Sequence, residues 1–319
     1  MQDALVLDGV TKRFGTFTAV DDLSLRVPAG SIYGFIGPNG AGKTTTIRMI
    51  MSIFYPDSGR IEVLGHDRPE SIKDRLGYLP EEKGLYKSMK VHEIVSYFGQ
   101  LKGLDAKTAN ARATELLTRY GLGDWLDTKC QALSKGMGQK VQVLGTILHG
   151  PELVILDEPF SGLDPVNMDL MRQTILDMKR EGRTVIFSTH VMAQAEEICD
   201  YVMMIHRSKK VLDGTIAEVK STAGQGIRIA YDGDGPTTFQ ALQDRGLLTS
   251  YRDAGKEAEL FPADGADTQD ILRALVDRVT VRRFDVSEAS LHEIFVRTVK
   301  AAGQPIAEEE VAATQEGVR

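Results

Sequence analysis

The sequence predicts an α/β fold built on a parallel sheet, followed by a smaller α+β domain. Two compact apolar runs, ELVILDEP and RTVIFSTH, are typical of buried parallel strands, and a helical pattern from Pro165 to Arg180 separates them. A glycine-rich loop, GPNGAGKTTT, stands between a strand pattern and a helix pattern. In the last third of the chain, strands and helices are expected in a different order. The first two observations predict the parallel core, and the third predicts a second domain.

The composition is that of a globular protein with two domains. The chain has 319 residues, of which 42% are hydrophobic and 26% charged, and domains usually run about 100 to 200 residues. The formal net charge of -7 argues against a nucleic-acid partner, because phosphate backbones attract basic surfaces. Two cysteines, Cys130 and Cys199, lack the spacing of a disulfide framework or a zinc site, which fits a reducing cytosol.

No membrane-spanning or secretory segment is expected. No stretch approaches about 20 consecutive apolar residues, and the first residues, MQDALVLDGV, lack a basic start followed by an apolar core. Any role at a membrane therefore requires a partner that spans it.

Short strand patterns open the first domain, which is expected to span residues 1–215. ALVLDGV, LSLRV and SIYGFIG are each bounded by Gly, Pro or Asp, and a helix opens at Gly42. Residues 91–120 show helical periodicity without a strand pattern, so we expect a helical subdomain, at about residues 88–145, inserted into the core. YVMMIHRSKKVLDG is typical of a hairpin at the end of the domain.

The second domain is expected at residues 216–302. Strand, helix, strand, strand, helix and strand patterns follow in that order, which is a ferredoxin-like arrangement. A final helix closes the domain, because Leu291, Ile294, Phe295 and Val299 recur at helical spacing. The tail, residues 303–319, is expected to be disordered, since it is polar and carries an acidic run.

The loop from Gly37 to Thr44 matches the phosphate-loop pattern G-x-x-x-x-G-K-[ST]. Its glycines let backbone N–H groups turn toward a polyphosphate, and the helix N-terminus adds about half a positive charge. We expect Lys43 to reach the β and γ phosphates and the Thr44 hydroxyl to ligate Mg²⁺. The other residues predicted to contact the phosphates are Gly37, Asn39, Gly40, Gly42 and, near the α phosphate, Thr45.

Two acids follow the apolar run LVIL. A strand end delivers carboxylates to the edge of a parallel sheet, so we expect Asp157 to hold Mg²⁺ and Glu158 to act as general base toward the attacking water. Without a phosphate loop, such a pair is more often a helix cap or a surface feature. His190 ends the next strand pattern and is expected to bridge the γ phosphate and the base, although a lone histidine there is usually structural.

In their order, GPNGAGKTT, LSKGMGQK, LVILDEP, SGLD and STH resemble the ATP-binding cassette (ABC) family of transport ATPases over residues 4–215. The resemblance implies a P-loop NTPase core that binds ATP and Mg²⁺. It also implies that Ser134 and Gly136 bind the γ phosphate of an ATP held by a second cassette, in a head-to-tail dimer. Asp164 would link the two sites, and Phe14 would stack on adenine, unless it is a core aromatic beside a strand.

Three residues depart from the family pattern. Lys135 and Met137 replace a glycine and the glutamine of the usual signature, and Glu81 replaces a glutamine that normally touches Mg²⁺ or the attacking water. Glu81 could still coordinate Mg²⁺, or it could be a solvent-facing acid. These variants, together with SLHEIF on the last helix, resemble the branch that serves ABC-2 type exporters, which includes drug- and sodium-efflux systems.

We therefore expect the ATPase subunit of an exporter, bound at the cytoplasmic face of the membrane to a separate permease. A groove near Glu81 would receive a short helix of that permease, with Tyr86 and Met89 as candidate contacts. One alternative is a regulatory cassette that binds ATP with little hydrolysis. Another is a soluble ABC ATPase acting on nucleic acid or ribosomes, but the chain lacks the long coiled coil or the second cassette that those types carry.

Overall fold

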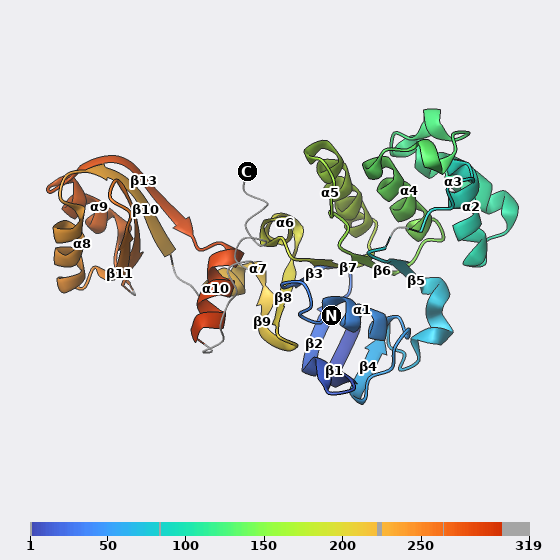
Figure 1. Ribbon diagram of the computed structural model, residues 1–319, viewed down its shortest axis with the longest axis horizontal. Coiled ribbons are helices and arrows are strands. Elements are labelled where there is room, and N and C mark those ends of the chain that lie inside the picture. Colours follow the sequence, from blue (N-terminus) through green and yellow to red (C-terminus); the bar gives the residue numbers. More distant parts are fainter. Residues whose placement is uncertain (1, 83, 222–224, 264, 302–319) are drawn as a thin grey trace. The chain divides into compact units, whose positions relative to one another are not determined.

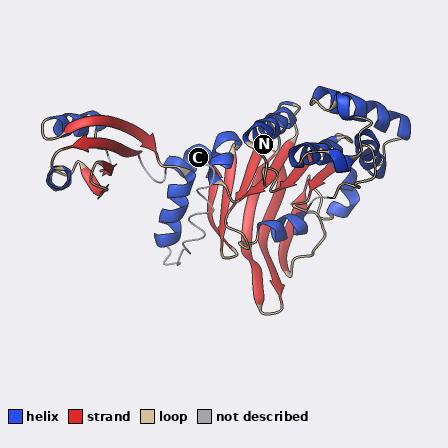
Figure 2. Cartoon of the chain, turned by 45° about the horizontal axis from the view of Figure 1, so that its top comes forward, coloured by secondary structure: helices blue, strands red, loops and turns tan. Residues whose placement is uncertain are grey.

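The computed structural model describes residues 2–82, 84–221, 225–263 and 265–301 (Figure 1). They form two compact units, which divide between Gly214 and Thr215. Figure 2 shows helices packed along the sheets of each unit. None of the helices in the described part of the chain is long and apolar enough to cross a membrane. The predicted tail, 303–319, lies outside the described residues.

The first unit is built on a six-stranded sheet, in which four successive pairs of neighbouring strands are parallel. In order across the sheet, its strands are β5 (Leu76–Leu79), β6 (Leu153–Asp157), β7 (Thr184–Thr189), β3 (Ile32–Ile36), β8 (Tyr201–His206) and β9 (Lys209–Thr215). Every residue of β3, β6 and β7 is buried, as parallel strands covered on both faces must be. The predicted α/β fold with a buried parallel sheet is confirmed.

A second, antiparallel sheet packs against the same core. It consists of β2 (Phe17–Pro28), β1 (Asp3–Phe14) and β4 (Ser58–Val63). Helix α1 (Lys43–Ile50) lies between the two sheets, and one apolar cluster joins β1, α1 and β3 through Leu7, Ile47 and Phe35 (Figure 1). The phosphate loop at the start of α1 is thereby fixed from both sides.

The remaining helices of the first unit flank the parallel sheet. Three of them, α2, α3 and α4, gather beyond β5 and β6 and form a helical arm (Figure 1). The helices are α2 (Val91–Leu101), α3 (Ala106–Arg119), α4 (Lys135–Ile147), α5 (Pro165–Arg180) and α6 (Met192–Ile198), with short 3-10 turns at Pro69–Arg75, Gly123–Trp125 and Cys130–Ala132.

The second unit has a four-stranded antiparallel sheet with helices α8 (Gly235–Asp244) and α9 (Thr268–Val276) along one face. The strands in order across the sheet are β11 (Leu248–Asp253), β12 (Glu257–Pro262), β10 (Gln225–Asp232) and β13 (Thr280–Glu288). Ile229, Phe239 and Ile271 belong to its buried core. Helices α7 (Ile216–Ser221) and α10 (Leu291–Ala301) complete the unit. An α+β domain is therefore present, and the ferredoxin-like assignment stays a prediction.

The central strand β6 gives a test of the packing. Ile155 is fully buried between two neighbouring strands, so Ile155→Ala is expected to lower the free energy of unfolding by about 2 to 5 kcal/mol. Val166→Ala, at a side chain that is 71% exposed, should change it by less than about 0.5 kcal/mol. Urea unfolding followed by the fluorescence of Trp125, the single tryptophan, reports on the first unit. Equal midpoints for the two variants would contradict the buried position of Ile155.

Candidate functional site

The phosphate loop connects β3 to α1 and depends on glycine at two positions in particular. Gly40 and Gly42 have φ angles of 77° and 115°, in the region that side chains rarely adopt. A Cβ on Gly42 would also lie 2.4 Å from the carbonyl oxygen of Ala19, and one on Gly37 would lie 2.2 Å from that of Ile205. Helix α1 starts at Lys43 with no acid in its first turn, so its positive end is left for an anion.

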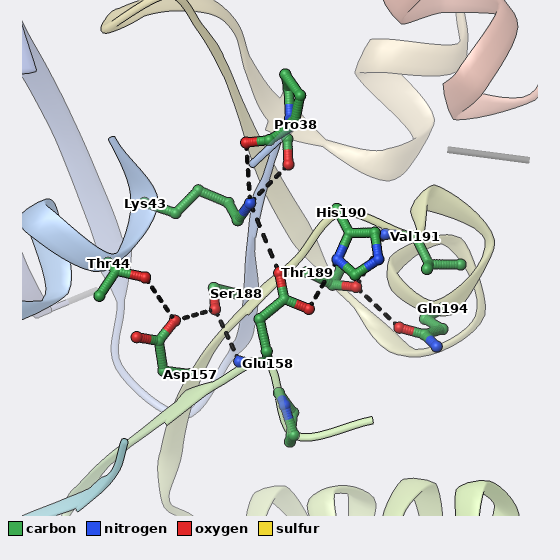
Figure 3. Close-up of polar contacts among 12 residues, drawn as sticks. Pro38, Lys43, Thr44, Asp157, Glu158, Ser188, Thr189, His190, Val191 and Gln194 are labelled. Carbon is green, nitrogen blue, oxygen red and sulfur yellow. Dashed lines mark hydrogen bonds and ion pairs between the residues drawn. The ribbon is translucent and has the colours of Figure 1, made fainter. Parts of the chain in front are cut away.

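The ammonium of Lys43 lies in the centre of the site (Figure 3). Its Nζ donates to the carbonyl oxygens of Gly37, at 2.7 Å, and Pro38, at 3.2 Å, and is 3.6 Å from Oε1 of Glu158. The side chain is only 6% exposed. Burial lowers the pKa of Lys43, and the neighbouring carboxylates of Glu158 and Asp157 oppose that shift. The cation therefore depends on these acids for its charge.

Asp157 ends β6 and presents one carboxylate oxygen that no described residue contacts by hydrogen bond. Its Oδ1 accepts hydrogen bonds from the hydroxyls of Ser188, at 2.5 Å, and Thr44, at 3.3 Å. Its Oδ2 is buried and has no hydrogen-bond partner among the described residues. Burial raises the pKa of Asp157, against the effect of the two hydrogen bonds. A hydroxyl beside an unpaired carboxylate oxygen is a donor set that suits a hard cation such as Mg²⁺.

Glu158 follows directly, in a backbone conformation that is rare outside glycine. Its φ is 49°, which costs about 1 to 2 kcal/mol for a residue with a side chain. Its N–H donates to the Ser188 hydroxyl at 2.9 Å, and its Oε2 lies 3.0 Å from Nδ1 of His190 (Figure 3). The Glu158 side chain is 8% exposed, whereas that of His190 is 24% exposed. The carboxylate is thus held between Lys43 and His190.

Sequence reasoning missed Ser188, which contacts both acids. It is fully buried in β7 and is the direct parallel neighbour of Asp157 in β6. A signal was present, because strand alternation places Ser188 on the same side of the sheet as His190 two residues later. A serine within an apolar run does not by itself indicate a functional role, however, and its contact with Asp157 becomes evident only when the register with β6 is known.

A second cluster forms where the N-termini of α4 and α5 meet. Ser134 caps α4 by accepting from the N–H of Met137 at 3.2 Å, and Asp164 caps α5 by accepting from the N–H of Asn167 at 3.0 Å. Asn167 also donates to Asp164 through Nδ2, at 2.6 Å, and a Cβ on Gly136 would lie 2.5 Å from this amide. Ser134, Gly136 and Asp164 are thereby brought together.

Within the described ranges, neither Ser134 nor Asp164 makes a hydrogen bond or ion pair to the phosphate loop or to the acids Asp157 and Glu158. Lys135, the residue in place of a family glycine, reaches the loop before α5 instead. Its Nζ would lie 1.7 Å from a Cβ on Gly162, so the end of the Lys135 side chain lies directly over this glycine, whose φ of 65° also favours glycine. The Nε2 of Gln139 donates to the carbonyl of Pro159, which links α4 to the residue after Glu158.

The other predicted contact residues lie at the rim. Asn39 is exposed and Thr45 half-buried. Phe14 is 44% exposed at the end of β1 and packs edge-on against Phe54, with ring centroids 5.5 Å apart. Glu81 is exposed after β5, and its negative charge opposes the lowering of the Lys43 pKa that burial causes.

A glycine loop at a helix N-terminus, beside a strand that ends in two acids, defines a P-loop nucleotide-binding protein of the α/β class. The chain belongs to the ABC transporter family of ATP-binding subunits. The ABC transporter family profile matches residues 20–161, and that of the ATP-binding protein DrrA1-3-like C-terminal domain matches residues 214–299.

Named relatives and a solved structure agree with this membership. The chain is 38% identical to the uncharacterized ABC transporter ATP-binding protein YhaQ of Bacillus subtilis (strain 168), over 93% of this chain and 99% of YhaQ. It is 32% identical to the Nod factor export ATP-binding protein I of Burkholderia lata, over 90% of this chain and 94% of that protein. A solved structure of the ATP binding subunit of an ABC transporter matches with a TM-score of 0.63 and 30% identity, over 69% of this chain and 92% of that one.

The glycine loop gives a test of the site. Gly42→Ala adds a methyl group that meets a backbone carbonyl at a left-handed position, so affinity for a fluorescent ATP analogue is expected to fall at least about tenfold. Gly30→Ala is the matched control, because Gly30 is also left-handed, with φ of 75°, but has no atom within 4 Å of the added carbon. Equal affinities for the two variants, measured by fluorescence titration, would contradict this role of the loop.

Proposed function

We propose that the chain binds and hydrolyses ATP with Mg²⁺ and powers an ABC-2 type exporter through ATP-driven dimerisation. The observation that carries the proposal is the Glu158 carboxylate, which is buried between Lys43 and His190 and directly follows Asp157 in the chain. A general base must lie within reach of the water that it activates and must be oriented by its neighbours. Glu158 meets the second condition through both of its carboxylate oxygens.

The phosphates are assigned to the loop and the start of α1. Backbone N–H groups at Gly40 and Gly42, with Asn39 beside them, cradle the chain of phosphates, and Lys43 contacts the β and γ phosphates. The N–H of Gly37 donates to the Thr189 carbonyl at 3.3 Å, so Gly37 contributes close approach of the backbone rather than a donor. Thr45 lies near the α phosphate, and the exposed ring of Phe14 stacks on adenine. Thr44 and Asp157 would hold Mg²⁺, with Glu81 as a further ligand. The bound ion would neutralise charge on the phosphate oxygens as the bond to the γ phosphate breaks.

Hydrolysis is assigned to Glu158 and His190. Glu158 accepts a proton from the water that attacks the γ phosphate in line, and ADP and phosphate leave. His190 holds the Glu158 carboxylate and contacts the γ phosphate. The Lys43 ammonium, desolvated between carbonyls and carboxylates, stabilises the charge that spreads over the transferred phosphoryl group.

The second cluster is assigned to the ATP of a partner cassette. Ser134 is exposed at the positive end of α4, and it makes no contact with its own phosphate loop that the described residues record. Two chains placed head to tail would let Ser134, Gly136 and Asp164 of one chain complete the site of the other. ATP then stabilises the dimer by mass action, and its hydrolysis removes that stabilisation.

A cavity of about 250 Å³ beside β5 is assigned to the membrane permease. Its lining includes Tyr78, Pro80, Phe98 and Leu101, and Tyr86 reaches it through an aromatic chain in which Tyr97 contacts Phe98. An apolar groove with exposed aromatic residues suits the apolar face of a short helix, and Met89 lies in the same segment. The chain would then sit at the cytoplasmic face of the membrane as a peripheral subunit without a nucleic-acid partner.

A regulatory cassette with little hydrolysis is the second candidate. Lys135 favours it. This residue stands where the family signature has a glycine, and its long side chain lies over Gly162. The complete set of Lys43, Asp157, Glu158 and His190 favours hydrolysis.

Removal of the base tests hydrolysis and dimerisation together. Glu158→Gln keeps the size of the side chain but cannot accept a proton, so Mg²⁺-dependent ATP hydrolysis is expected to fall at least about 100-fold. An ATP-bound dimer should then accumulate in light scattering. Glu115→Gln, at an exposed acid of α3, is the matched control and should keep the activity of the native chain. A monomer of Glu158→Gln in excess ATP would count against the dimer.

The groove is tested by placing a charge in it. Leu101 is 64% exposed and lines the cavity, so Leu101→Glu is expected to reduce co-purification with the proposed permease about tenfold, as the loss of one apolar anchor does. Ile53→Glu introduces the same charge at a side chain that is 52% exposed and outside the cavity, and should leave recovery unchanged. Equal losses in both variants would mean that the groove is not the contact.

A further inference from the structure

We infer that Ser188 is a positioning residue, whose single hydroxyl holds both acids of the site, Asp157 and Glu158, in the arrangement that hydrolysis requires. This inference rests on the proposed function. Ser188 is fully buried, and its hydroxyl makes a hydrogen bond to each acid: one to the Asp157 carboxylate at 2.5 Å and one to the Glu158 N–H at 2.9 Å.

The sheet register places Ser188 there. Parallel pairing of β6 with β7 aligns Asp157 with Ser188 and Leu156 with Phe187. Neighbours in register point to the same side of a sheet, so the hydroxyl faces the Asp157 carboxylate rather than the apolar core. An apolar residue at this position would pack as well but would leave the buried Glu158 N–H without its acceptor.

The direction of the two hydrogen bonds is fixed by chemistry. The backbone N–H of Glu158 can only donate, so the Ser188 oxygen accepts from it, and the one hydroxyl hydrogen is left to donate to Asp157 Oδ1. Thr44 donates to the same oxygen. The Asp157 carboxylate is therefore held with Oδ1 occupied, whereas Oδ2 has no hydrogen bond from the part of the chain that the structure describes. Oδ2 is thus the oxygen available for a cation.

The same hydroxyl anchors Glu158 in a conformation that it would not otherwise keep. A left-handed φ is disfavoured for glutamate, and a residue before proline is restricted further. Ser188 holds the N–H of Glu158 on one side, and Gln139 holds the carbonyl of Pro159 on the other. With the backbone fixed, the side chain reaches Lys43 and His190.

Loss of the hydroxyl is expected to impair the reaction far more than nucleotide binding. The glycine loop and Lys43 bind phosphate from β3 and α1, and they make no hydrogen bond to Ser188 within the described residues. The base and the metal carboxylate, by contrast, lose their common anchor. A displacement of about 1 Å in a catalytic group can lower the rate by about 100-fold.

The test compares Ser188→Ala and Ser188→Thr with a matched control in the full chain. Thr174→Val removes another buried hydroxyl, which donates to a backbone carbonyl within α5. For Ser188→Ala we expect kcat for ATP to fall about 10- to 100-fold, while KM and the Kd for a fluorescent ATP analogue change less than about threefold. Amide hydrogen exchange at Glu158 should accelerate at least about tenfold. Ser188→Thr restores the hydroxyl and should recover most of the lost kcat and the slow exchange.

The outcomes separate this inference from the proposed function. Full kcat in Ser188→Ala, with hydrolysis abolished in Glu158→Gln, would overturn the role of Ser188 and leave the proposed function standing. The same follows if Thr174→Val loses as much kcat as Ser188→Ala, or if Kd weakens as much as kcat falls. If the native chain itself binds but does not hydrolyse ATP, with or without its permease, the proposed function fails and the inference fails with it.

Discussion

The buried charge of Lys43 is the constraint on which the rest of the site depends. An ammonium that is 6% exposed pays a desolvation penalty, and here two loop carbonyls and the Glu158 carboxylate compensate it. Removal of either Lys43 or Glu158 would take from the other its nearest opposite charge in a buried place, so the lysine and the acid have to be placed together. That placement requires the ends of β3, β6 and β7 to meet at one edge of the sheet, which their parallel pairing provides.

The sheet fixes this first cluster, whereas the helices fix the second. The N-termini of α4 and α5 lie together through Asn167, and Gly136 and Gly162 leave room for the side chains that cross between them. Gln139 connects this region to Pro159, directly after the base. A shift of α4 would therefore move Pro159, and with it the neighbouring Glu158, through the hydrogen bond from Gln139.

The sequence allowed prediction of the parts of the site that carry a local signal. Lys43, Asp157 and His190 each follow a recognisable strand, so their meeting at one sheet edge could be expected. Strands β4 and β5 were not predicted, because Ser58–Val63 has only two buried residues and Leu76–Leu79 is four residues long. Ser188 acquires its partners through the register with β6, which no local pattern predicts, and the left-handed φ of Glu158 likewise has no local sequence pattern. The reach of Lys135 to Gly162 depends on two helix ends that lie apart in the sequence.

The most direct measurement is a crystal structure of the chain with Mg²⁺ and a non-hydrolysable ATP analogue. The account predicts that the triphosphate lies in the loop from Gly37 to Thr44, that Lys43 exchanges the loop carbonyls for phosphate oxygens, and that Ser134 of a second copy contacts the γ phosphate. A nucleotide bound elsewhere, with Lys43 still donating to Gly37 and Pro38, would contradict the account. So would a γ phosphate that faces Ser134 of its own chain.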